Sequence, residues 1–142
     1  MFAILSRWGF PITGLLVIAA AVAIPFGCAR PPGNAPARVD GTVYWQGRPL
    51  VDGLVSFSPD PERGGTGKLM VAAIGSDGGF RLAEGQATIF PGWYRVAISD
   101  GVGSSESAGF PVALRRPDRS GLEREVKPGQ DHHFEFLIEP TR

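Results

Sequence analysis

The sequence is short of several residue types on which common protein functions depend. Its 142 residues include one cysteine and two histidines, which rules out an internal disulfide and leaves few ligands for a transition metal. Acidic and basic residues number 14 each, so no basic excess points to nucleic acid as a partner. These shortages argue against disulfide-stabilised, zinc-dependent and nucleic-acid-binding classes.

Charge is missing altogether from Trp8 to Ala29, the run that follows Arg7. A basic start, an apolar stretch and the junction of Gly27 with Cys28 are typical of a bacterial export signal that ends in a lipidation site. The run resembles bacterial lipoprotein signals, in which a small residue precedes the cysteine. This resemblance implies that residues 1–28 are a hydrophobic signal helix, and that the thiol of Cys28 becomes lipidated.

Two other interpretations of this run remain open. It is long enough to span about 30 Å of hydrocarbon as an uncleaved anchor, with Arg7 kept in the cytoplasm. It also fits an ordinary cleaved signal peptide, which would leave a free thiol at Cys28. All three interpretations place the rest of the chain outside the cytoplasm, and the first two attach it to a membrane. Ala29 is not the aspartate associated with inner-membrane retention, which favours the outer membrane in a host with two membranes.

The ten residues from Ala29 to Arg38 contain three prolines and predict an extended tether. At about 3 Å per residue, this tether would hold the following domain up to about 30 Å from the bilayer. We therefore expect one globular domain over residues 39–142.

From Val39 onward the hydrophobic pattern alternates with period two, which is typical of half-buried strands. The alternating runs are Val39–Gln46, Leu54–Ser58, Gly92–Ser99 and His132–Glu139. Leu69–Ile74 is a continuous apolar run and predicts a strand buried on both faces. Phe110–Leu114 is a candidate short edge strand. With about seven short strands and no helix after the signal, we expect an all-β fold, an antiparallel two-sheet sandwich of the Ig-like or transthyretin-like kind.

Two connections are long for such a fold. The first connection is Asp60–Lys68. The second is Asp100–Gly129, which is too long for an ordinary hairpin loop. We expect the second to cross between sheets or to form an irregular lid.

Five short segments occur in a characteristic order: Val39–Val43, Gly47–Leu50, Val55–Pro59, Ser76–Phe80 and Gly92–Val96. This succession resembles the carboxypeptidase regulatory-like domain. The resemblance implies a transthyretin-like, or prealbumin-like, sandwich that is usually a non-catalytic appendage. Three later segments, Arg116–Leu122, Glu125–Gly129 and Phe134–Phe136, are similar to small secreted lipoproteins of planctomycete-type bacteria.

The segments that could carry catalytic or metal-binding chemistry lack the residues or the placement that this chemistry requires. Gly64–Lys68 lacks the first glycine and the final Ser or Thr of a phosphate-binding loop. The serines of Gly103–Gly109 have no nucleophile-elbow context. His132 and His133 are consecutive strand residues, so they point to opposite faces and cannot readily chelate one ion. We therefore predict a protein that is not an enzyme and has no catalytic residue, cofactor or metal site.

Two aromatic residues are the candidates for ligand binding. Tyr44 and Trp93 lie on the strand faces opposite the expected core, where flat rings can stack on sugars. The leading hypothesis is a non-catalytic, membrane-tethered extracytoplasmic domain with a structural or interaction role at the cell envelope. The alternative is a carbohydrate- or peptide-binding module that uses these aromatics or a sheet edge. An envelope protein or a glycan is the expected partner, and the oligomeric state is left open.

Overall fold

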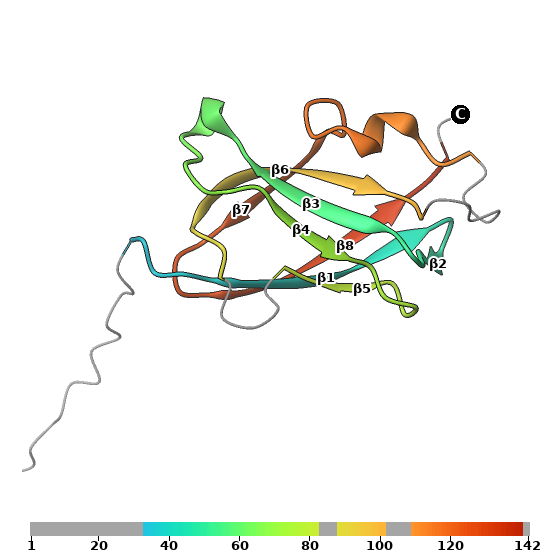
Figure 1. The fold of residues 1–142 in the computed structure, drawn as a ribbon, viewed down its shortest axis with the longest axis horizontal. Coiled ribbons are helices and arrows are strands. Elements are labelled where there is room, and N and C mark those ends of the chain that lie inside the picture. The colour runs from blue at the N-terminus through green and yellow to red at the C-terminus, as the bar shows by residue number, and fades with distance from the viewer. Residues whose placement is uncertain (1–32, 83–87, 102–108, 141–142) are drawn as a thin grey trace, which may run out of the picture.

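The computed structural model describes residues 33–82, 88–101 and 109–140, which form two β-sheets packed face to face (Figure 1). The strands are β1 (Arg38–Trp45), β2 (Arg48–Pro49), β3 (Leu54–Pro59), β4 (Met70–Ala73), β5 (Gly79–Arg81), β6 (Gly92–Ser99), β7 (Leu122–Val126) and β8 (Asp131–Ile138). The 3₁₀ helices η1 (Pro61–Arg63) and η3 (Val112–Arg115) lie in two connections. The predicted all-β character is confirmed. The expected signal helix lies outside the described residues.

The first sheet is built around β1. Along one side of β1, β5 pairs with Asp40–Thr42 and β2 pairs with Tyr44–Trp45, both antiparallel. Along the other side, β8 pairs over the whole length of β1, with Val39 opposite His132. The predicted alternation of β1 is confirmed, because Val39, Gly41 and Val43 are buried while Asp40 and Thr42 between them are only half-buried.

The pairing of β1 with β8 is parallel, so the prediction of an entirely antiparallel sandwich is wrong for this pair. β7 belongs to the second sheet, and the turn after Val126 carries the chain across to the first sheet. A strand that crosses between sheets need not form a hairpin with its predecessor, so it can join β1 in the parallel direction. Gly41 lets the strands approach, because a Cβ there would collide with the carbonyl oxygen of Phe134.

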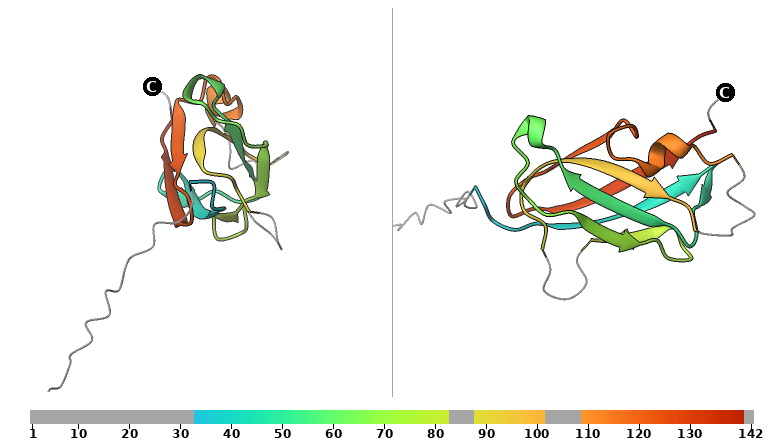
Figure 2. Two further views of the ribbon diagram at one scale, coloured as in Figure 1. Left: turned by 90° about the vertical axis from the view of Figure 1, so that its left-hand side faces the viewer. Right: turned by 45° about the horizontal axis from the view of Figure 1, so that its top comes forward.

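The second sheet has the order β4-β3-β6-β7 and is antiparallel throughout. Val96 and Ile98 of β6 are fully buried, whereas Trp93 and Arg95 lie on the outer face. The predicted sidedness of this strand is therefore confirmed. Figure 2 shows the two layers edge-on, with β1 and β8 in one layer and β3, β4 and β6 in the other.

Phe57 of β3 lies at the centre of the core between the sheets. Its ring centroid lies 6.0–6.5 Å from the centroids of Phe80, Tyr94, Phe134 and Phe136. Three of these rings come from the first sheet and one from the second, so a single fully buried side chain joins both layers. Burial of aromatic surface of this kind dominates the stability of a domain without disulfides.

Three local predictions are wrong. In the predicted buried run Leu69–Ile74, Val71 is more than half exposed because β4 is an edge strand whose outer face meets solvent, and Leu69, which precedes β4, is also more than half exposed. Phe110–Leu114 is not a strand, because Val112–Arg115 forms η3. Phe110 packs against the ring of Trp45 at the end of β1. The segment of β7 was expected to belong to the long connection Asp100–Gly129, but it forms a strand of the second sheet.

The strand β7 escaped prediction because an arginine occupies one of its inward positions. Arg124 lies with its guanidinium 4.7 Å from the ring centroid of Phe136, at the open side of the sandwich between β7 and β8. The flanking Glu123 and Glu125 are exposed. A run of three charged residues hides the period-two pattern that marks a strand in a sequence.

Candidate functional site

The N-terminal segment enters the sandwich at one end and is fixed there by backbone hydrogen bonds. The N–H of Gly129 donates to the carbonyl of Ala35 at 3.1 Å, and Ala37 and Ile89 exchange bonds of 3.0 and 3.2 Å. The predicted lipidation residue, Cys28, lies outside the described residues. The described part of the chain therefore begins at the end of the sandwich formed by the start of β1 and the turn between β7 and β8 (Figure 1).

The structure does not bring the two candidate aromatics together. Tyr44 lies on the outer face of the first sheet, in register with Pro49 and Leu137. Trp93 lies on the outer face of the second sheet, beside Glu125. Because the two sheets face each other, their outer faces point in opposite directions, and no single ligand can stack on both rings.

Each aromatic is also half-buried. The guanidinium of Arg63 lies 4.4 Å from the centre of the Trp93 ring and covers one of its faces. A cation held in this way over an indole is an attractive contact in its own right. Trp93 is therefore part of a polar cluster and not a free stacking platform.

This polar cluster surrounds Asp60, which is the only buried charged side chain among the described residues. Asp60 is 2% exposed, and its carboxylate lies 3.0 Å from the guanidinium of Arg95. It also accepts a hydrogen bond from the backbone N–H of Glu62, as the N-cap of η1, and lies 3.8 Å from the guanidinium of Arg63. A buried carboxylate needs partners of this kind, because its desolvation is costly when it is left alone.

The cluster continues outward to β7. Arg63 forms an ion pair of 2.7 Å with Glu123, and Arg95 is hydrogen-bonded to Glu62 as well as to Asp60. Although partial desolvation opposes it, the neighbouring carboxylates of Asp60 and Glu62 raise the pKa of Arg95. The guanidinium thus stays charged and is held from two sides.

A groove of about 300 Å³ opens beside these residues on the outer face of the second sheet. It is lined by Glu62, Arg95, Pro117, Asp118, Gly121, Leu122 and Glu123. Asp118 is held by Arg116 through bonds of 3.1 and 3.0 Å, and the hydrogen bond to Arg116 lowers the pKa of this carboxyl group. The volume reaches the lower end of the range of about 300–1,000 Å³ typical of small-ligand sites.

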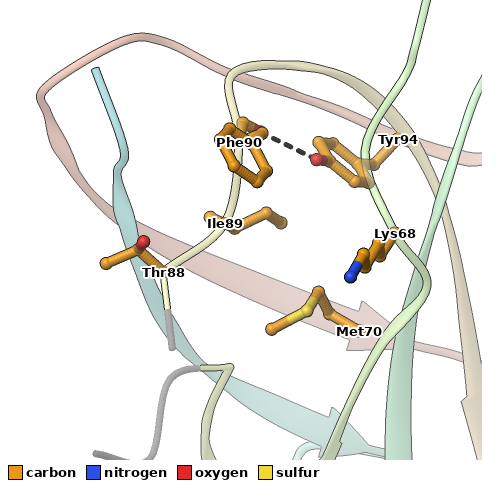
Figure 3. Close-up of a pocket in the computed structure, with 6 residues that line it drawn as sticks. All are labelled: Lys68, Met70, Thr88, Ile89, Phe90 and Tyr94. Carbon is orange, nitrogen blue, oxygen red and sulfur yellow. Dashed lines mark hydrogen bonds between the residues drawn. The ribbon is translucent and has the colours of Figure 1, made fainter. Parts of the chain in front are cut away.

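A second, smaller pocket lies at the end where the N-terminal segment enters (Figure 3). It is lined by Lys68, Met70, Thr88, Ile89, Phe90 and Tyr94. Its volume of about 50 Å³ leaves room for only a few water molecules. The Tyr94 hydroxyl donates to the carbonyl of Phe90 at 2.8 Å, and burial raises the pKa of this phenol. The pocket is too small for a metabolite.

The two histidines occupy different environments, as their alternation predicted. His133 lies on the outer face of the first sheet, 2.9 Å from the carboxylate of Asp40. His132 stacks on Phe134, with a centroid distance of 5.6 Å, and its Nε2 accepts from the N–H of Lys127 at 2.9 Å. In the part of the chain that the structure describes, no group of three or more His, Cys, Asp or Glu side chains is placed to hold a metal ion.

Sequence reasoning missed the charged groove. Asp60, Arg95 and Glu123 come from three segments, and only the pairing of β3 with β6 and of β6 with β7 brings them together. One signal was available, because Asp60 precedes a proline and therefore fits the N-cap of a short helix. Nothing in the spacing indicated that its carboxylate is buried.

Within the described ranges, no helix is long and apolar enough to cross a membrane. Comparison of the chain with protein-family models, with curated proteins and with solved structures finds no match.

Proposed function

We propose that this protein is a non-catalytic, extracytoplasmic β-sandwich that is tethered to a membrane by its N-terminus and has an interaction role at the cell envelope. The observation that carries the proposal is the way the N-terminal segment joins the domain. It follows an export-type sequence and is bonded to one end of the sandwich at Ala35 and Ala37. A domain held at one end presents its sheet faces and its far end to partners.

The order of its turn and strand motifs supports a sandwich of the carboxypeptidase regulatory-like kind. In that family the sandwich is usually a non-catalytic module. The tight turn at Asp77 fits a structural role for these motifs, because its carboxylate accepts from the N–H of Gly79 at 2.9 Å.

The tether is tested at Cys28. Mass spectrometry of the mature protein is expected to show an N-terminus at Cys28 that carries acyl chains, and the Cys28→Ser variant is expected to leave the membrane fraction. An intact Met1 on a membrane-bound chain would instead support an uncleaved anchor. A soluble mature chain with a free thiol would overturn the tether.

The charged groove favours glycan binding as a second candidate function. The residues that line the groove and those directly behind them form ion pairs between four carboxylates and four guanidinium groups. The carboxylates are Asp60, Glu62, Asp118 and Glu123, and the guanidinium groups are those of Arg63, Arg95, Arg116 and Arg119. These charges cancel, so recognition would depend on hydrogen bonds and not on net charge. Neutral polyhydroxyl ligands suit such a surface.

A glycan array tests this second candidate. Binding by the wild-type chain should be lost in Glu123→Ala, which removes part of the groove lining. It should be weakened in Trp93→Ala, which removes the ring that supports Arg63, the ion-pair partner of Glu123. It should persist in Tyr44→Ala, which changes an aromatic ring on the opposite sheet. If all three variants retain the same binding, the groove is not the site. A peptide that adds to a free sheet edge would bind independently of Glu123.

A further inference from the structure

We propose that the end of the sandwich where the N-terminal segment enters is a membrane-contacting surface. We name this surface the entry rim and define it by Lys68, Leu69, Thr88 and Phe90. Phe90 and Leu69 are inferred to insert into the interfacial layer of a phospholipid bilayer. The inference rests on the proposed tether and adds an orientation to it, because a tether fixes the distance of the domain from the bilayer but not the direction in which the domain faces.

The first argument is apolar exposure on a fixed backbone. Phe90 is 53% exposed and Leu69 is 59% exposed. The backbone carbonyl of Phe90 is held by the hydroxyl of Tyr94 (Figure 3), and the backbone of its neighbour Ile89 is hydrogen-bonded to Ala37. An aromatic ring presented from a fixed backbone beside a lysine is typical of residues at membrane interfaces.

The second argument is position. The entry rim lies beside Ala37, and Ala35 is the first described residue bonded to the sandwich, so the six residues from Ala29 to Asn34 can reach at most about 20 Å. Attachment of Cys28 to a bilayer would therefore keep the rim close to the lipid surface. Binding becomes intramolecular at a high effective concentration, so even a small apolar surface can dock.

The third argument is charge. Arg38, Lys68 and Lys127 lie at this end, and none of them forms an ion pair with a described residue. The arginines around the groove and η3 are paired: Arg63, Arg95, Arg115, Arg116 and Arg119. Unpaired cations near a surface attract anionic lipid headgroups. Because Glu125 and Asp131 also lie at this end, we expect the dependence on anionic lipid to be modest.

The experiment uses the full chain, purified with its native N-terminus and reconstituted into vesicles of phosphatidylcholine with or without phosphatidylglycerol. Phe90→Cys and Thr88→Cys are each labelled with an environment-sensitive fluorophore, the second being a milder change in the same rim. Leu137→Cys is the matched control, since Leu137 is 69% exposed but lies at the far end of β8. Because Cys28 is the only native cysteine, lipidation of its thiol leaves the introduced thiol as the only one to be labelled.

We expect the probes at positions 88 and 90 to shift to shorter wavelength and to be quenched by nitroxide-labelled lipid, with the probe at 137 unchanged. Docking is overturned if the chain floats with the vesicles while the probes at 88 and 90 behave like the probe at 137. A chain that does not float with the vesicles overturns the tether and the docking together. Flotation thus separates failure of the proposed function from failure of this inference.

Discussion

The guanidinium of Arg95 lies 3.0 Å from the carboxylate of Asp60, and this contact joins the centre of the second sheet to η1. Asp60 is also bonded through its backbone, donating from its N–H to the carbonyl of Trp93 at 2.9 Å. The outer face of β6 is therefore attached to η1 by side chain and main chain at once. This attachment forms the base of the charged groove.

Removing the Asp60 carboxylate should destabilise the fold. Asp60→Ala deletes the N-cap of η1 and the buried partner of Arg95, and we expect a loss of about 2–4 kcal/mol in the free energy of unfolding. Urea denaturation followed by fluorescence measures it. Glu62→Ala is the control, because Glu62 is 78% exposed and its removal should change stability by only about 0.5 kcal/mol. Equal effects of the two variants would show that Asp60 does not hold the cluster.

The pKa of Tyr94 is raised above its ordinary value of 10.0 by burial, which predicts alkaline sensitivity. Above pH 10 the unfolded phenol releases its proton while the folded one retains it. Stability is therefore complete below pH 10 and falls as the pH rises toward the folded pKa. Unfolding free energies measured from pH 8 to 11.5 should decline more steeply for the wild type than for Tyr94→Phe. Parallel pH profiles would contradict the assignment.

Phe57 should be the most sensitive single position of the aromatic core. It is fully buried and contacts rings from both sheets, so Phe57→Ala is expected to cost about 3–5 kcal/mol. Calorimetry or urea unfolding will measure the loss. Leu137→Ala removes a mostly exposed apolar side chain and should cost little. A small effect at Phe57 would mean that the two layers are joined elsewhere.

Glycine is required at position 41 for a steric reason. In Gly41→Ala the new methyl group would collide with the backbone carbonyl of Phe134 and lie 2.7 Å from ring atoms of Phe80. We expect β8 to detach from β1 and the protein to unfold or accumulate in inclusion bodies. Gly47→Ala is the comparison, since Gly47 has φ of +76° but open space around it, and it should cost about 1 kcal/mol. A folded, stable Gly41→Ala chain would show that β8 does not approach β1 this closely.

Much of the local structure could be predicted from alternation. The faces of β1, β3, β6 and β8 follow directly from period two, because side chains of neighbouring strand residues point to opposite sides. The same rule separated Tyr44 and Trp93 from the core. It could not show that they lie on opposite outer faces, since alternation assigns a residue to one side of its own strand and says nothing of the sheet to which that strand belongs.

The groove and the entry rim depend on pairings between distant segments. Lys68 and Phe90 share one pocket, although they belong to different connections. Arg95 meets Asp60 because β3 and β6 are neighbours. Each residue type alone is compatible with many environments, so its role depends on contacts that span tens of residues.

The sequence by itself determined most of the strand-forming segments, the sidedness of most strands and the turn at Asp77, because steric and hydrophobic preferences act between near neighbours in the chain. Only the tertiary structure decided the parallel pairing of β1 with β8, the inward position of Arg124 and the burial of Asp60. These features arise from competition among long-range pairings, in which the whole buried surface is optimised at once. A pattern of neighbouring residues therefore cannot predict which long-range pairing forms.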